Sequence, residues 1–109
     1  MQETIIISLG GSLIVPDNID KEFLKSFKTL ILEHVAKGKK FVITTGGGKV
    51  CRRYQDTATE ISNASNEDRD WIGIAALKLN AELLRVVFKE FAHNKVIDDL
   101  SKPFELTKP

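Results

Sequence analysis

The sequence is poor in the residues that build cross-linked or metal-bound domains. Its 109 residues include one cysteine and two histidines. A single cysteine excludes an intramolecular disulfide and a zinc site built from cysteines, and it suits a reducing, cytoplasmic environment. The two histidines have no companions at metal-ligand spacing, so we expect no metal site on the chain.

Long apolar runs and an excess of charge of one sign are also missing. No stretch approaches the roughly 20 apolar residues that cross a bilayer, and the first residues lack the pattern of a signal peptide. Sixteen basic and fifteen acidic side chains leave a net charge of +1, which argues against a nucleic-acid-binding surface. We therefore expect a cytoplasmic globular protein without a membrane or nucleic-acid partner.

What the sequence does contain is an alternation of short apolar runs and helical patterns. Residues 4–9 and 41–45 are rich in β-branched apolar residues, as is typical of parallel strands covered on both faces. Residues 95–97 are a candidate third strand, and residues 98–109 form a polar tail. Apolar spacing by three and four predicts three helices, over about 21–37, 49–61 and 68–92. This order predicts a layered α/β/α fold with a mostly parallel sheet.

The helix boundaries carry their own signals. Asp20 is a plausible N-cap for the first helix, and Gly38 is placed to end it in a left-handed conformation. The inner face of the third helix is expected to hold Ile72, Ala75, Ala76, Leu79, Leu83, Val86, Val87 and Phe91.

Both strands end in glycine clusters, Gly10-Gly11-Ser12 and Gly46-Gly47-Gly48. Open α/β sheets bind ligands at the carboxyl ends of their strands, and glycine amides beside a helix N-terminus can cradle a phosphate. Glycines after strands are also ordinary turn residues. Two clusters on neighbouring strands favour a phosphate site, although neither matches the P-loop or the dinucleotide fingerprint.

Positive charge follows the second cluster. Lys49, Arg52 and Arg53 lie at the start of the second helix, where the helix dipole disfavours cations unless an anion is bound. The alternative is a solvated basic turn. Arg52 and Arg53 point about 100° apart, so at most one of them is expected to face a ligand.

Asp70 is the remaining candidate. On local signals alone, an acid at the start of the third helix is an N-cap or a first-turn residue that the dipole stabilises. Gly73 interrupts the same helix, which indicates a close approach of some group to that turn. Cys51 is interpreted as a packing residue, and Trp71 as a core or interface residue.

Three motifs together resemble the amino-acid kinase superfamily. They are Gly10-Gly11-Ser12, the run from Thr45-Gly46-Gly47-Gly48 through Tyr54, and Asp70-Trp71-Ile72-Gly73-Ile74. Within that superfamily the chain resembles the archaeal-type uridylate kinases, over essentially its whole length. The resemblance implies a carbamate-kinase-like fold, transfer of the ATP γ-phosphoryl group to UMP with Mg²⁺ assisting, and a homo-oligomer, a hexamer in this family.

The resemblance also implies roles for individual residues. Gly10, Gly11 and Ser12 would lie along the ATP phosphates and the transferred group. Gly48 and Arg52 would contact the phosphoryl donor, with Arg52 also serving catalysis. UMP would be contacted by Gly47 and, at its ribose hydroxyls, by Asp70.

Two departures from the family pattern stand out. Many members carry a lysine two residues before the first glycine, where this chain has Ser8. Family members are also roughly twice as long, and their later part supplies most of the ATP pocket. We therefore interpret residues 1–109 as the N-terminal part of such a kinase, with the C-terminal ATP-binding part absent. Two alternatives stay open: a related kinase for a small acid or isoprenoid phosphate, and a non-catalytic nucleotide-binding or oligomerisation module.

Overall fold

The computed structural model describes residues 3–16, 18–92 and 96. Its elements follow one another as β1 (Thr4–Leu9), α1 (Gly11–Ile14), α2 (Lys21–Ala36), β2 (Lys40–Thr45), α3 (Gly48–Ser62) and α4 (Asn66–Val87). The two strands pair in parallel from Thr4 opposite Lys40 to Leu9 opposite Thr45, so the prediction of an α/β fold with parallel strands is confirmed. The strand expected over 95–97 lies outside the described residues apart from Val96, which belongs to no element.

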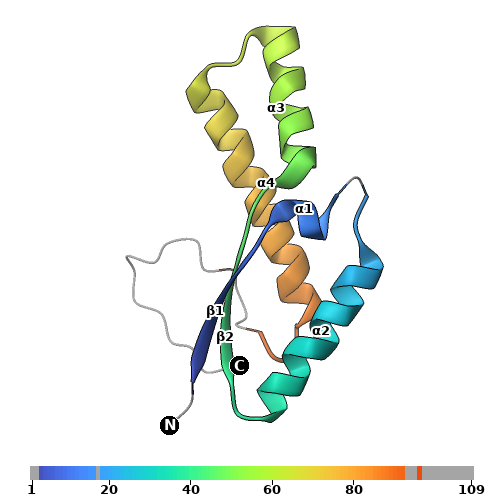
Figure 1. Cartoon of the computed structure of the whole chain (residues 1–109). Coiled ribbons are helices and arrows are strands. Elements are labelled where there is room, and N and C mark those ends of the chain that lie inside the picture. Colours follow the sequence, from blue (N-terminus) through green and yellow to red (C-terminus); the bar gives the residue numbers. More distant parts are fainter. Residues whose placement is uncertain (1–2, 17, 93–95, 97–109) are drawn as a thin grey trace.

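The core lies between the sheet, α2 and the second half of α4 (Figure 1). Phe27 of α2 meets Phe88, just after α4, edge to face with ring centroids 6.1 Å apart. This aromatic contact joins two helices that are distant in sequence. The buried apolar residues of the cluster are Leu9, Ile14, Val15, Leu24, Ile31, Leu84 and Phe88.

In the described part of the chain, only one face of β1 is covered. Leu9 is buried and Ile7 packs against the core, whereas Ile6, on the opposite face, is 74% exposed. The expectation that this strand is covered on both faces is therefore wrong. The reason is that the described helices supply a single layer, on the side of α2.

Some boundaries of the helices agree with the sequence signals and others do not. The Asp20 carboxylate accepts the Phe23 N–H at 3.0 Å, which confirms it as the N-cap of α2. Gly38 has a φ of +88°, the left-handed conformation expected after that helix. The short helix α1, which begins at Gly11 of the first glycine cluster, was not among the predicted helices.

The inner face of α4 also differs from the expectation. Leu79 is 70% and Val86 52% exposed, whereas Leu84 and Phe88 are buried. The helix ends at Val87 rather than near residue 92. The buried residues of the helix are Asn80 and Leu84, one turn apart, while Leu83 and Val87 of the expected face are partly buried and pack against the core. None of the helices in the described part of the chain combines the length and apolarity needed to cross a bilayer.

Candidate phosphate and nucleotide site

The two glycine clusters meet at the carboxyl ends of the paired strands, where β1 and β2 pass into α1 and α3 (Figure 1). A Cβ added to Gly11 would overlap the Gly48 nitrogen and would lie 2.5 Å from the Gly46 carbonyl oxygen. Real Cβ atoms do not approach backbone that closely, so only glycine fits at position 11. The strands that carry the two clusters are neighbours, as predicted, and this contact brings the clusters together.

The second cluster is shaped by glycine at two further positions. Gly48 has a φ of +73°, which side-chain-bearing residues rarely adopt. A Cβ on Gly47 would lie 2.8 Å from the Cβ of Cys51 and 3.4 Å from the Cβ of Ala76. Cys51 is buried against this turn, as expected for a packing residue. Gly10 differs, since a Cβ there would meet nothing within 4 Å.

The first turn of α3 is open to an anion. Its N-cap is Gly47, which has no side chain to accept a hydrogen bond from the first amides of the helix. Lys49 and Arg52 are both exposed on this part of α3. Free helix amides and nearby cations are the groups that bind phosphate oxygens. Ser12 is half-buried in α1, beside the same contact.

Asp70 does not cap α4. The N-cap is Ser65, which forms a capping box with Asp68, and the first-turn acids are Glu67 and Asp68. Bonds from the Ser65 backbone N–H and hydroxyl lower the pKa of the Asp68 carboxyl. The sequence interpretation of Asp70 as a cap or first-turn residue is therefore wrong, because α4 begins before the residues that were considered. Asp70 lies in the second turn, and it is exposed.

A network of polar side chains joins α3 to the first turns of α4 next to Asp70. Arg69 donates to the Thr59 hydroxyl at 2.7 Å and to the Gln55 carbonyl at 3.3 Å. Gln55 in turn donates its side-chain amide to the Arg69 carbonyl at 2.8 Å. A Cβ on Gly73 would lie 3.6 Å from that amide, an ordinary packing distance, so no contact among the described residues requires glycine there and the close approach predicted at Gly73 stays a prediction.

These contacts define which predicted residues come together. Gly11, Ser12, Gly47 and Gly48 converge, and Arg52 follows about one turn later on α3. Asp70 is separate from them. Gln55 is bonded to Arg69, the residue before Asp70. On α3, Gln55 lies seven positions after Gly48, roughly 10 Å along the helix at 1.5 Å per residue. The predicted site residues are thus spread out, with the glycine loops at one end and Asp70 along the α3–α4 hairpin.

Sequence reasoning missed Asn80 and Thr45. Asn80 is 6% exposed, and its side-chain amide donates to the Gly46 carbonyl at 2.8 Å. The Thr45 hydroxyl donates to the Leu77 carbonyl at 2.9 Å. The available signal was the position of Asn80 one turn from both Ala76 and Leu84, on a stripe that is otherwise apolar.

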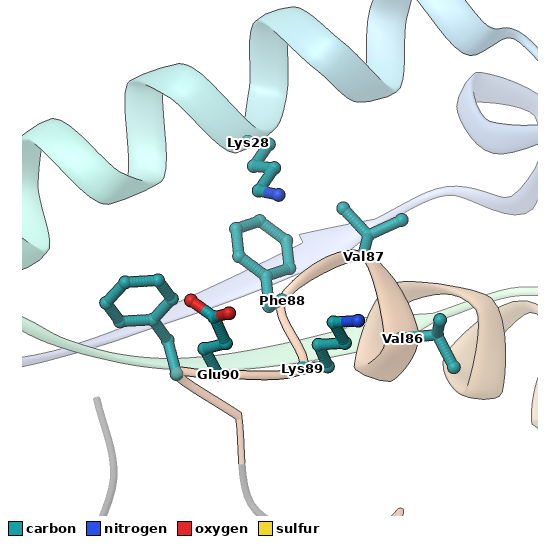
Figure 2. A pocket seen from close by; sticks show the side chains of 7 residues that line it. Lys28, Val86, Val87, Phe88, Lys89 and Glu90 are labelled. Carbon is teal, nitrogen blue, oxygen red and sulfur yellow. The ribbon is translucent and has the colours of Figure 1, made fainter.

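Two hollows accompany the fold. An apolar groove of about 320 Å³ lies beside Gly47 and is lined by Val15, Ile19, Val50, Ala76, Leu79, Asn80 and Leu83. A smaller hollow of about 130 Å³ lies around Phe88, between Lys28 of α2 and the residues that end α4 (Figure 2). It contains none of the predicted site residues. In the described part of the chain no group of three His, Cys, Asp or Glu side chains is arranged to hold a metal ion.

Comparison with known proteins agrees with the motifs. The model of the Amino acid kinase family matches residues 3–104. The chain belongs to the amino acid kinase family. The glycine contact, the open start of α3 and the hairpin described above are thus parts of an amino acid kinase domain.

Relatives within this family include uridylate kinases of archaea. The chain is similar to the uridylate kinase of Pyrococcus abyssi, with 35% identity over 87% of this chain and 41% of the relative. It is also similar to that of Thermoplasma acidophilum, with 40% identity over 74% of this chain and 34% of the relative. The chain therefore spans less than half the length of these curated relatives.

Solved structures show the same fold. The uridylate kinase of Archaeoglobus fulgidus superposes with a TM-score of 0.72 at 37% identity, covering 89% of this chain and 42% of that one. The UMP kinase of Bacillus anthracis superposes with a TM-score of 0.64 over 83% of this chain and 37% of that one. At 22% identity the second likeness concerns the fold alone.

Proposed function

We propose that this chain carries the nucleotide-acceptor and phosphate loops of a uridylate kinase, which transfers the γ-phosphoryl group of ATP to UMP in pyrimidine nucleotide biosynthesis. The observation that carries the proposal is the backbone contact between Gly11 and Gly48, which places two glycine clusters and the start of α3 around one point. The similarity to uridylate kinases supports the choice of acceptor.

In this reaction a phosphate oxygen of UMP forms a bond to the γ-phosphorus while the bond from that phosphorus to the β,γ-bridging oxygen breaks. UDP forms, and ADP leaves with the bond's electron pair. Phosphoryl transfer needs mainly positioning and charge neutralisation. We assign the positioning to the amides around Gly10, Gly11, Ser12, Gly47 and Gly48.

Arg52 supplies positive charge on the donor side in this proposal. Ser8 stands where many family members have a lysine, and it is exposed near the end of β1. The exposed Arg52 and Lys49 are the cations nearest in sequence to the glycine contact. The described residues offer no ligand cluster for Mg²⁺, so we propose no position for the ion on this chain.

Asp70 is proposed to accept hydrogen bonds from the ribose hydroxyls of UMP. Its exposure leaves the carboxylate available, and the Arg69 network holds the turn that carries it. The nucleotide would lie with its phosphate at the glycine loops and its ribose along the hairpin. A ligand without ribose hydroxyls could not make these hydrogen bonds to the Asp70 carboxylate.

We also propose that the protein acts in the cytoplasm as a homo-oligomer. Large apolar side chains are exposed on both helices of the hairpin, among them Tyr54, Ile61, Trp71 and Leu79. Burying them against a second copy would remove apolar area from water. Trp71 is 62% exposed, so it is not a core residue of the chain. Analytical ultracentrifugation should show species larger than the monomer.

An acceptor screen tests the proposed function. The 109-residue chain is mixed with UMP, a small carboxylic acid or an isoprenoid phosphate. Binding of each acceptor is measured by calorimetry, and turnover is measured as ADP release with ATP present. We expect UMP to bind, and ATP-dependent turnover in a longer chain to fall sharply in Arg52→Ala. Turnover with another acceptor alone would favour the related kinase, and UMP binding without turnover in the longer chain would favour a binding module. Absence of UMP binding would contradict the proposal.

A further inference from the structure

Asn80 is the one buried polar side chain among the described residues. It lies on the stripe of α4 that also holds Leu84 and Phe88, both in the apolar core. One turn earlier, Ala76 packs near Gly47. A leucine at position 80 would suit these surroundings, whereas a buried amide costs free energy unless it is hydrogen-bonded. The hydrogen bond that the Asn80 side chain makes therefore has to offset the free-energy cost of burying its amide.

That bond goes to a single peptide group of the second glycine cluster. The side-chain Nδ2 of Asn80 donates to the Gly46 carbonyl oxygen at 2.8 Å. The same oxygen faces Gly11, whose added Cβ would lie 2.5 Å from it. Asn80 and the first glycine cluster thus contact the Gly46 carbonyl together, and they fix where it points.

The direction of this carbonyl determines the direction of the next amide. None of the peptide bonds in the described chain is cis, and in a planar trans peptide the C=O and the following N–H point in opposite directions. Holding the Gly46 carbonyl toward α4 therefore turns the Gly47 N–H away from α4. Glycine has no side chain, so this N–H is the only donor that Gly47 can offer to a ligand.

We propose that Asn80 is a positioning residue that orients the Gly47 N–H toward the phosphate group of the acceptor nucleotide. The proposal rests on the function proposed above and adds a residue that touches neither substrate. Without the bond, rotation of the Gly46–Gly47 peptide becomes free, because glycine on both sides permits a wide range of dihedral angles. The phosphate would then lose an oriented donor while the rest of the nucleotide site stays in place.

The test compares UMP with uridine, which lacks the phosphate. Both are titrated into the ¹⁵N-labelled chain, as wild type and as Asn80→Leu, with Asn80→Asp as a second variant that keeps the side chain's shape. Loss of one hydrogen bond to the charged phosphate is expected to lower the affinity of Asn80→Leu for UMP by a factor of roughly ten or more. Uridine affinity should be unchanged, and the Gly47 amide resonance should shift in the free protein.

Thr45→Val is the matched control. It removes the other side-chain hydrogen bond between this turn and α4, the one to the Leu77 carbonyl, and leaves the Gly46–Gly47 peptide held. It should lower stability and preserve the ratio of UMP to uridine affinity. A purely structural role for Asn80 predicts equal losses for UMP and uridine, or the same ratio change in Thr45→Val, and either result overturns the proposal.

The outcomes also separate this inference from the proposed function. If wild type binds UMP and Asn80→Leu binds it equally well, the positioning role is wrong and the proposed function stands. If wild type binds UMP no better than uridine, the phosphate site itself is wrong, and both proposals fail together. A shift of the Gly47 amide with a selective loss of UMP affinity supports both.

Discussion

The two halves of α3 are held by different kinds of contact. At its start, glycine backbones of two clusters touch directly, with Gly11 against Gly46 and Gly48. Further along, the helix is joined to α4 by long polar side chains, chiefly Arg69 and Gln55. Backbone contact leaves no room for adjustment, whereas side-chain bonds can be remade at modest cost. The fold is therefore rigid where we place the phosphates and more tolerant where we place the ribose.

The largest expected effect comes from adding one methyl group to the rigid half. Gly11→Ala forces a Cβ into the backbone of Gly46 and Gly48, and overpacking of this kind costs about 3 kcal/mol or more when the neighbour is backbone. Gly10→Ala is the matched control, because its Cβ meets open space. Urea denaturation should show a large loss of unfolding free energy in the first variant and little change in the second. Equal unfolding free energies for Gly11→Ala and Gly10→Ala would contradict the view that the start of α3 is the rigid half.

A smaller effect is expected in the hairpin. Arg69→Leu keeps the aliphatic part of the side chain but removes its bonds to Thr59 and to the Gln55 carbonyl. We expect a loss of about 1–2 kcal/mol, since these partly buried bonds involve a charged donor. Asp56→Asn removes only the exposed ion pair at 3.4 Å, which is worth about 0.5 kcal/mol or less. Thermal melts that ranked the two variants in reverse order would contradict the role given to Arg69.

The smallest effect concerns the start of α4. Hydrogen bonds from Ser65 lower the pKa of Asp68 below its ordinary value. The contribution of this carboxylate to stability is therefore full above the ordinary pKa and is lost as the pH falls through the folded-state pKa. Ser65→Ala removes the hydroxyl and should raise the pKa of Asp68, with a small fall in Tm at neutral pH. An NMR titration of the Asp68 carboxyl follows this change directly. An unchanged pKa in Ser65→Ala would show that the Ser65 hydroxyl does not contribute to the shift and that the backbone N–H alone lowers the pKa.

Local signals predicted the parts of the fold that depend on neighbouring residues. The Asp20 cap, the left-handed Gly38 and the parallel strands follow from short patterns, and they are confirmed. The glycine clusters were found for the same reason, since they interrupt two apolar runs. Their binding roles, and those of Arg52 and Asp70, stay predictions.

What the sequence did not reveal depends on tertiary contacts. The helix expected over about 68–92 begins earlier, at Asn66, because Ser65 and Asp68 form a capping box there. Asn80 was missed because its partner, Gly46, lies 34 positions away. The buried positions of α4 include the polar Asn80, whereas the apolar Leu79 and Val86 are exposed, so hydrophobicity alone predicts the wrong face.

The central claim is that the rigid and the tolerant half of α3 hold one nucleotide between them. The most direct test is calorimetric titration with UMP and 2′-deoxy-UMP of wild type, Asp70→Ala and Glu67→Gln, the last being a control for loss of an exposed acid on α4. We predict that wild type and Glu67→Gln prefer UMP, and that Asp70→Ala loses this preference while still binding both nucleotides through the glycine loops. Equal affinity of wild type for the two nucleotides, or an undiminished preference in Asp70→Ala, would contradict the account.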